Sequence, residues 1–352
     1  MRTTICVLII AVATACLADT TFVSGAVSGV WDTSGSPYIL IDNTTIPDGE
    51  TLVIGPGVDI IFECAFCDFS AIGPLIINGD SVFSVSIRGS GYTAHHELNG
   101  YVEGDYCIFE NLWMYFGGEI KNSLFRNMIF IQSLGGIIKE SQVINDSSHS
   151  ITLASGRFVN CLINLKSESS LICGSEVGGN IYLVNSTIII PSGTTSGAMY
   201  MGGFFYTAYY FNSIFIGEAE TDLEEVGFYY SLVYGTPVSL SAIFVDTIQG
   251  LPSFLEPDSS DYRLSDSSIA IGAGTTSCFM EIMRPGGSAS APSIDILGNP
   301  RPNPLGSMPD LGCYENALAF PAPIGETPTS RPSSITISSC LLYTSDAADE
   351  LD

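Results

Sequence analysis

Basic residues are scarce in this chain. Its 352 residues include 11 Lys and Arg against 37 Asp and Glu, so the formal net charge is −26. Lysine occurs only at Lys121, Lys139 and Lys166. A protein without a basic stripe cannot release counterions from a phosphate backbone, which excludes nucleic acid as the main partner. The same deficit disfavours anionic polysaccharides, unless Ca²⁺ bridges the two negative partners.

Apolar residues do not recur at helical spacing. Beyond the first 18 residues, no segment has an uninterrupted apolar run long enough to span a bilayer. The chain is nevertheless 46% hydrophobic and only 14% charged. This composition predicts very little helix and a long apolar interior behind a surface rich in Ser, Thr, Asn and Gly.

The N-terminus has the pattern of a signal peptide. Arg2 precedes an apolar run that begins at residues 5–10, and small residues follow before Asp19. We expect cleavage after Ala18 and export of the protein. A degenerate lipoprotein box over residues 13–16 is the alternative.

Short strand patterns alternate with turn patterns. Residues 38–41, 51–54 and 58–62 are rich in β-branched and aromatic side chains, and the turn sequences Pro47-Asp-Gly49 and Gly55-Pro-Gly57 separate them. Turns at this spacing are too frequent for helices and predict successive short strands.

An asparagine recurs two residues after an aromatic residue or Leu. Asparagine suits a left-handed corner between strands, and stacked corners can form a ladder of side-chain amide hydrogen bonds. The irregular spacing predicts a solenoid whose coils vary in length, with about nine or ten coils between residues 37 and 254. A propeller or a sandwich would not explain these corners. The predicted ladder consists of Asn111, Asn127, Asn160, Asn185 and Asn212.

Three motifs stand near the C-terminus. They are Asp261-Tyr-Arg-Leu264 with its continuation to Gly274, Asp295-Ile-Leu-Gly-Asn-Pro-Arg-Pro302, and Asp310-Leu-Gly-Cys-Tyr-Glu315. Together they resemble the end of secreted bacterial surface proteins of the choice-of-anchor Q type, in the pectate-lyase-like superfamily. The pattern departs from that family at Ile269, Gly272 and Cys313, where the family has Pro, Asp or Asn, and Ala. Residues 38–62 resemble the entry coil of the same proteins.

The resemblance implies an all-β fold, a single-stranded right-handed parallel β-helix, but it names no reaction. We expect the two recognised segments to seal the ends of one apolar column. The expected divisions are a signal peptide (1–18), a lead-in (19–36), β-helix coils (37–255), a closing region (256–316), a Pro/Ser/Thr linker (317–339) and a tail (340–352). The tail resembles a translated sequencing adapter, which predicts a metagenomic fragment whose natural C-terminus, with any anchoring segment, is missing.

The cysteines match no zinc ribbon. Cys64-Ala-Phe-Cys67 is a C-x-x-C sequence without the βαβ surroundings of a thioredoxin-like site, and no second pair completes a metal tetrahedron. We therefore expect most cysteines to fill the interior. Cys278 and Cys313, both in the closing region, form the candidate disulfide.

Candidate catalytic residues are few. A glycoside hydrolase needs two carboxylates from adjacent coils, for which Glu110 and Glu140 are weak candidates. His95, His96 and Glu97 form the one cluster of imidazoles and a carboxylate, but neighbours in a strand point to opposite faces and cannot share a metal. The acidic stretch near residue 220 predicts a solvated loop, with weak Ca²⁺ candidates at Glu218, Glu220 and Asp222.

Clustered tyrosines give the most suggestive binding pattern. Alternation should turn half of them outward, where tyrosines on a flat sheet can hold sugar rings or a protein partner. The candidate binding residues are Tyr206, Tyr209, Tyr210, Tyr229 and Tyr230.

These patterns predict a monomeric, exported protein of the extracellular space or bacterial cell surface, which binds glycans or a host or cell-surface protein without catalysis. A polysaccharide lyase or glycoside hydrolase is the alternative, and a structural envelope stalk is the second alternative. No cofactor is predicted, with Ca²⁺ as the exception to test.

Overall fold

The structure is a computed structural model. It describes residues 20–91, 94–147, 149–165, 171–173, 179–190, 199–200, 206–217, 219–220, 225–235, 237–238, 242–280 and 287–321. The expected signal peptide, nearly all of the expected linker and the adapter-like tail lie outside the described residues. The chain divides into two compact units, Met1–Ile129 and Phe130–Asp352.

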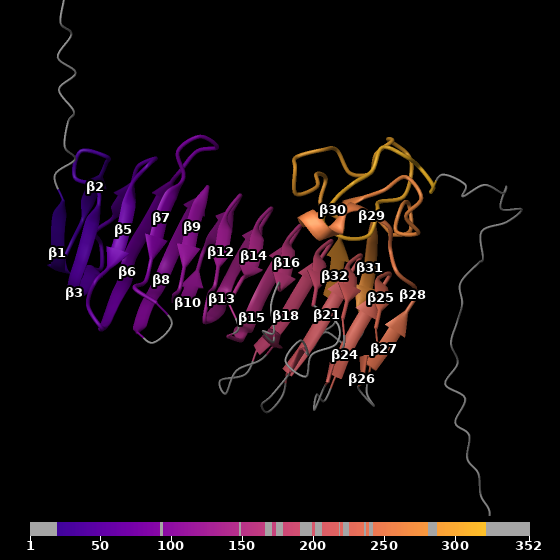
Figure 1. Ribbon diagram of the computed structural model, residues 1–352, viewed down its shortest axis with the longest axis horizontal. Helices are drawn as coiled ribbons and strands as arrows, with labels where there is room; N and C mark the ends of the chain where they lie inside the picture. Colours follow the sequence, from indigo (N-terminus) through magenta and orange to yellow (C-terminus); the bar gives the residue numbers. More distant parts are fainter. Residues whose placement is uncertain are drawn as a thin grey trace, which may run out of the picture. The chain divides into compact units, whose positions relative to one another are not determined.

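The first unit is a stack of parallel strands (Figure 1). Strands β3 and β6 each pair with several others, and β8 pairs with β6, β10 and β11. The pairings between the described strands of this unit are parallel. The strands are β1 (Thr21–Ala26), β2 (Gly29–Trp31), β3 (Tyr38–Ile46), β4 (Leu52–Ile54), β5 (Asp59–Phe62), β6 (Phe66–Asn78), β7 (Val85–Arg88), β8 (His95–Asp105), β9 (Cys107–Glu110), β10 (Trp113–Gly117), β11 (Glu119–Lys121) and β12 (Leu124–Arg126).

The second unit has the same construction, followed by two antiparallel hairpins. The parallel strands are β13 (Phe130–Lys139), β14 (Gln142–Asn145), β15 (Ile151–Val159), β16 (Leu162–Leu165), β17 (Leu171–Cys173), β18 (Gly179–Val184), β19 (Thr187–Ile189), β20 (Met199–Tyr200), β21 (Tyr206–Phe211), β22 (Ile214–Ile216), β23 (Ala219–Glu220), β24 (Glu225–Tyr229), β25 (Leu232–Tyr234), β26 (Pro237–Val238), β27 (Ala242–Val245) and β28 (Ile248–Gln249). The hairpins are β29 (Phe254–Glu256) with β30 (Asp261–Leu264), and β31 (Ser277–Met280) with β32 (Gly287–Ser290).

The predicted fold class is confirmed, because each unit is a solenoid of stacked parallel strands. The helical element among the described residues is one 3-10 turn, Pro257–Ser259. Within the described part of the chain, no helix is long and apolar enough to cross a membrane. The expected lead-in is itself part of the solenoid, since β1 and β2 pair in parallel with β3 and β4.

Alternation along the strands builds the interior. In β4, Leu52 and Ile54 are fully buried while Val53 between them is half-buried. Their partners in β6, Leu75 and Ile77, are buried in the same way. Because a shift of one residue would turn every apolar side chain outward, this pattern fixes the register of each coil.

Coil length varies, as the irregular asparagine spacing predicts. The coil that joins Leu162 to its partner Thr187 is a long one. The coil that joins Leu232 to its partner Ile248 is much shorter. The strands therefore stay in register while the loops between them absorb the difference in length.

The asparagine corners have the predicted left-handed backbone. The φ angles are 56° at Asn111, 50° at Asn127, 53° at Asn160, 44° at Asn185 and 49° at Asn212. A hydroxyl residue often follows the corner. The backbone N–H groups of Ser186 and Ser213 donate to the Oγ atoms of Ser213 and Ser231 in the next coil, both at 3.1 Å. Buried serines thus connect successive corners, a role that the asparagine pattern does not predict.

The predicted amide ladder is present between two asparagines, where Asn212 Nδ2 donates to Asn185 Oδ1 at 3.4 Å. The corner amides also bind the C-terminal segment. Asn160 Nδ2 donates to the carbonyl of Ile294 at 2.7 Å, Asn185 Nδ2 to that of Asp310 at 3.2 Å, and Asn212 Nδ2 to that of Thr275 at 2.6 Å.

These contacts correct the expected place of the closing region. Instead of sealing an end of the apolar column, it packs along the side of the second unit, against corners from successive coils (Figure 1). The three recognised motifs hold this segment in place.

A buried ion pair lies at the centre of the segment. Arg301 Nε and Glu315 Oε2 are 2.7 Å apart, and both side chains are fully buried. Arg301 also donates to Asn160 Oδ1 at 2.9 Å and to the carbonyl of Gly312 at 3.0 Å. Glu315 accepts from the backbone N–H groups of Asn303 and Asp310. Both charges of the pair therefore have further partners, and Arg301 connects the segment to a coil corner.

Asp310 makes stability depend on pH. Burial, with the charge of Glu315 second, raises its pKa from 3.8 to about 7. The folded state therefore binds this proton more tightly than the unfolded chain, and the stabilisation that protonation gives is lost as the pH rises through about 7. We expect urea unfolding to show a lower free energy of unfolding at about pH 8 than at about pH 5. Asp310→Asn, which does not titrate, should show a smaller loss, and an equal loss in both proteins would contradict this role.

Candidate functional site

An outward face of the first unit gathers aromatic, amide and acidic side chains. We define the β8 face as Asp68, His95, Glu97, Asn99, Trp113 and Tyr115, which come from the neighbouring strands β6, β8 and β10. In β8, His96 and Leu98 are buried, so that His95, Glu97 and Asn99 alternate with them and point outward.

Register brings these side chains together. Glu97 stands beside Asp68 of β6 on one side and Trp113 of β10 on the other. Tyr115 stands beside Asn99 in the same way. Since adjacent strands are about 4.8 Å apart, side chains in register on one face are direct neighbours.

Glu97 is the centre of the polar contacts on the β8 face. Its Oε2 lies 3.5 Å from His95 Nε2, and its Oε1 accepts a hydrogen bond of 2.8 Å from Asn99 Nδ2. The His95 ring stacks on Trp113, with ring centroids 4.8 Å apart and planes 27° apart. The side chains of His95 and Glu97 keep 43% and 25% of their surface exposed. The carboxylate is thus held in place and still reaches solvent.

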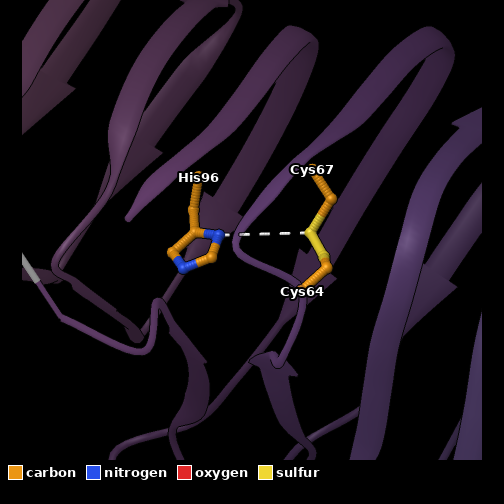
Figure 2. Close-up of side chains that lie close together, drawn as sticks. All are labelled: Cys64, Cys67 and His96. Atoms are coloured by element: carbon orange, nitrogen blue, oxygen red, sulfur yellow. Dashed lines mark hydrogen bonds between the residues drawn. A yellow bond between two sulfur atoms is a disulfide. The ribbon is translucent and has the colours of Figure 1, made fainter. Parts of the chain in front are cut away.

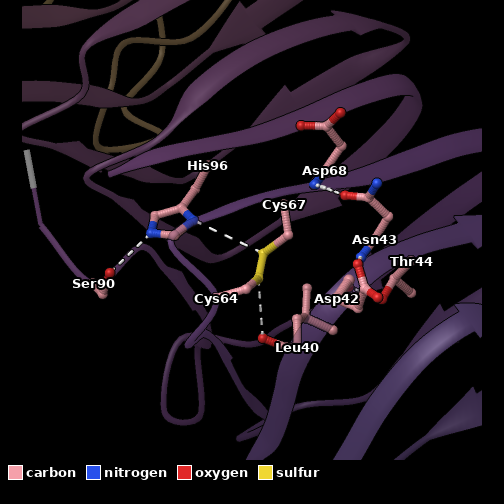
Figure 3. The surroundings of a disulfide bond; sticks show 9 residues. All are labelled: Leu40, Asp42, Asn43, Thr44, Cys64, Cys67, Asp68, Ser90 and His96. Atoms are coloured by element: carbon pink, nitrogen blue, oxygen red, sulfur yellow. Dashed lines mark hydrogen bonds between the residues drawn. A yellow bond between two sulfur atoms is a disulfide. The ribbon is translucent and has the colours of Figure 1, made fainter. Parts of the chain in front are cut away.

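The charge of Glu97 affects the pKa of two neighbours on this face. Burial, followed by the charge of Glu97, raises the pKa of Asp68. Burial and then Glu97 also raise the pKa of Tyr115. The backbone N–H of Asp68 donates to Asn43 Oδ1 at 2.9 Å, which places a further amide beside the face (Figure 3). The β8 face therefore combines stacked rings with adjacent acceptors, the groups that bind sugar rings and their hydroxyls.

The predicted tyrosine platform is wrong for three of its residues. Tyr210 is fully buried and stacks inside the coil on Phe228, with centroids 4.5 Å apart. Tyr209 and Tyr229 are 2% and 3% exposed, packed in a cluster with Ala289 of β32. Alternation turns these two outward as predicted, but the C-terminal hairpin covers them.

The remaining tyrosines have different positions. Tyr230 is a half-buried corner residue with φ of 48°. Tyr206 begins β21, and its side chain lies outside the described residues.

The candidate catalytic glutamates belong to separate units. Glu110 stands in register between Arg88 and Arg126 in the first unit. Glu140 is a corner residue of the second unit, with φ of 44°, and its Oε1 accepts from Asn160 Nδ2 at 3.4 Å. Each carboxylate thus has basic or amide neighbours of its own. Glu97 was considered only with the two histidines, and its pairing with Asp68 was not predicted.

The predicted disulfide between Cys278 and Cys313 is not formed, and both residues are free. Cys313 is buried against Leu162 and Tyr262, whereas Cys278 packs on the cluster around Tyr209. The two thiols are thus held in different packing clusters. Of the Ca²⁺ candidates, Glu218 and Asp222 lie outside the described residues, as does the side chain of Glu220, so that this site stays a prediction.

A second cluster lies on the inner side of the same strands. Cys64 and Cys67 form a disulfide, and His96 lies beside it (Figure 2). Cys67 Sγ is 4.0 Å from His96 Nδ1, and His96 Nε2 is 2.9 Å from Ser90 Oγ. Burial lowers the pKa of His96, and His95 adds a smaller effect in the same direction. As expected from strand alternation, the two histidines point to opposite faces.

The C-x-x-C sequence and the two histidines lie far apart in the chain, and no sequence pattern connects them. Their contact depends on the register of Cys67 in β6 with His96 in β8, which only the length of the intervening coil determines.

No family model, curated protein or solved structure matches this chain. The structure supports a parallel solenoid, while the resemblance to one family of such proteins rests on the motifs alone.

Proposed function

We propose that this protein is an exported glycan-binding module of the choice-of-anchor Q type, and that it holds a saccharide on the β8 face. The half-buried, stacked pair of His95 and Trp113 beside two carboxylates carries this proposal. Aromatic rings contact the C–H face of a sugar ring, while carboxylates and amides accept or donate hydrogen bonds to its hydroxyls.

Charge limits the class of glycan. Asp68 and Glu97 are both acidic, and the whole chain has a net charge of −26. Like charges facing each other cost binding energy, so uronate-rich or sulfated chains are poor ligands. We therefore propose an uncharged saccharide, or one with amino groups.

Binding should depend on Trp113. A screen of immobilised uncharged and amino-sugar glycans would identify a ligand, and isothermal titration of the full chain would give its dissociation constant. We expect Trp113→Ala to weaken binding about tenfold or more, since an aromatic contact contributes about 1 kcal/mol beyond its buried area. Trp113→Phe should retain most of the affinity.

Tyr234 provides the matched control. It is an aromatic residue of the second unit with 46% exposure, and Tyr234→Ala should leave the affinity unchanged. Thermal melting would verify that each variant folds. Failure of every glycan to bind, or equal losses in Trp113→Ala and Tyr234→Ala, would contradict the proposal and favour a structural stalk.

Glycoside hydrolysis is the second candidate, favoured by the register of Asp68 with Glu97. Neighbouring strands about 4.8 Å apart place two carboxyl groups near the separation of about 5–5.5 Å that retaining glycosidases use. A reducing-sugar assay on the bound glycan tests it. Activity lost in both Asp68→Asn and Glu97→Gln would establish hydrolysis, and the absence of released reducing ends would leave binding alone.

A further inference from the structure

Three metal-ligand side chains meet beneath the β8 face. Cys64 lies in the turn before β6, Cys67 in β6 and His96 in β8. Their Sγ and imidazole nitrogen atoms all lie within 4.8 Å of one another (Figure 2). Cys67 and His96 are buried, and Cys64 is half-buried, so the cluster has one side near solvent.

The surroundings of His96 fix its ring in a ligand orientation. Ser90 Oγ, 2.9 Å from Nε2, holds one ring nitrogen, and the other, Nδ1, points to Cys67 Sγ (Figure 3). A hydrogen-bond partner on the far nitrogen is the usual support of a metal-binding histidine. Gly89 makes room for the ring, because a Cβ there would clash with the His96 imidazole and with the carbonyl of Asn111.

We propose that Cys64, Cys67 and His96 form a thiol-controlled zinc site, which is closed in the disulfide form and binds one Zn²⁺ when the disulfide is reduced. This inference is independent of the proposed glycan binding, because its ligands lie on the inner side of the strands.

The distances suit zinc. Zn–S bonds of about 2.3 Å and Zn–N bonds of about 2.0–2.1 Å in a tetrahedron place ligand atoms about 3.6–3.8 Å apart. Cys67 Sγ and His96 Nδ1 are already 4.0 Å apart. Cys64 Sγ lies within 4.8 Å of the imidazole nitrogen, so that small movements of the two sulfur atoms after the S–S bond breaks bring all three ligand atoms to these separations. Water can occupy the fourth position on the half-buried side of Cys64.

Charge favours Zn²⁺ over Cu⁺. Two thiolates cancel the charge of Zn²⁺, and the occupied site is neutral, whereas Cu⁺ would leave one negative charge. An uncompensated charge in partly buried surroundings costs several kcal/mol.

The redox step balances with a dithiol as reductant. Its two thiols supply two electrons and two protons, the Cys64–Cys67 bond breaks, and a disulfide forms in the reductant. Zn²⁺ then displaces one proton from each cysteine thiol to solvent, and Zn–S bonds form. Reoxidation by a disulfide reverses these steps and releases the metal.

Cobalt titration of the full chain tests the site. The protein would be reduced with dithiothreitol, freed of reductant under anaerobic conditions and titrated with Co²⁺, a spectroscopic substitute for Zn²⁺. We expect one equivalent to bind, with sulfur-to-cobalt charge-transfer absorption and the d–d bands of a tetrahedral site. Zn²⁺ should displace the Co²⁺, and the untreated disulfide form should show neither signal.

Variants separate this site from the other thiols. Cys64→Ser/Cys67→Ser retains the free cysteines Cys107, Cys161, Cys278 and Cys313 and should lose the signal. Burial raises the pKa of Cys107 and of Cys313 to about 12, so neither is a ready thiolate ligand. Ser90→Ala, which leaves all three ligands in place, should weaken the metal affinity about 10–100-fold.

Circular dichroism of each variant would verify folding. Equal Co²⁺ binding by the reduced wild type and the double serine variant would overturn the proposal. Equal binding by the reduced and disulfide forms would also overturn it.

Discussion

Replacing Arg301 with methionine should lower the free energy of unfolding by about 3–5 kcal/mol, the cost of breaking a buried ion pair by removal of one partner. The side chains of Arg301 and Glu315 are both fully buried, and the Glu315 carboxylate would keep only the backbone N–H groups of Asn303 and Asp310. Asn160 Oδ1 and the carbonyl of Gly312 would also lose a donor. The loss should loosen the C-terminal segment from the coil corner.

Arg263→Met is the matched control. Arg263 pairs with Asp261 at 2.6 Å, but their side chains are 54% and 26% exposed. Exposed pairs contribute about 0–1 kcal/mol, so the control should change stability little. Urea unfolding followed by circular dichroism would measure both variants. Equal effects of the two substitutions would show that the buried pair does not hold the segment.

Replacing Phe228 with alanine should cost about 3–5 kcal/mol, the range for a large aromatic side chain in a packed core. Phe228 is 2% exposed and lies between Tyr210 and Phe244, with centroid distances of 4.5 Å and 5.4 Å. Phe215 contacts it edge-on at 6.0 Å. A truncation here removes the middle of an aromatic row that joins successive coils.

Phe244→Ala tests the same row at a more exposed position. Phe244 is 44% exposed, so its loss leaves little cavity and should cost about 1 kcal/mol. Both tryptophans, Trp31 and Trp113, belong to the first unit, so tryptophan fluorescence reports that unit while circular dichroism reports both. A cost at Phe228 no larger than that at Phe244 would contradict interior stacking.

The parallel solenoid could be predicted from local chemistry. Short β-branched runs and frequent turns predict the strands, and asparagine is the residue that most readily takes a left-handed corner. Asn111 and Asn212 confirm this, with φ of 56° and 49°. The serine that follows a corner has no such local signature, because its partner is the next coil.

Two features could not be predicted from the sequence: which segment packs over an outward-facing side chain, and which residues of successive coils pair in register. Alternation correctly turned Tyr209 outward, but it cannot show that Ala289, from a hairpin far along the chain, packs over it. Asp68 and Glu97 are neighbours across one coil, as are Cys67 and His96, and the sequence pattern does not define the length of that coil. In a solenoid whose coils vary in length, the residues of a site come from successive coils, and the register of strand pairing decides which of them are neighbours.

The C-terminal motifs contain the charged residues that hold the closing region in place, but the motifs do not show what those residues contact. Asp295, Arg301, Asp310 and Glu315 are the charged positions of two motifs, and each is buried or half-buried with hydrogen-bond partners. The closing region binds along the side of the coils, at their asparagine corners. A motif gives the identity and spacing of residues, but it does not show which surface of the protein they pack against.

The position of a bound saccharide tests the proposed function most directly. A crystal structure of the full chain with a glycan selected by the screen should show a sugar ring over His95 or Trp113, with its hydroxyls bonded to Asp68, Glu97 or Asn99. A sugar bound to another surface, with the β8 face empty, would contradict the account.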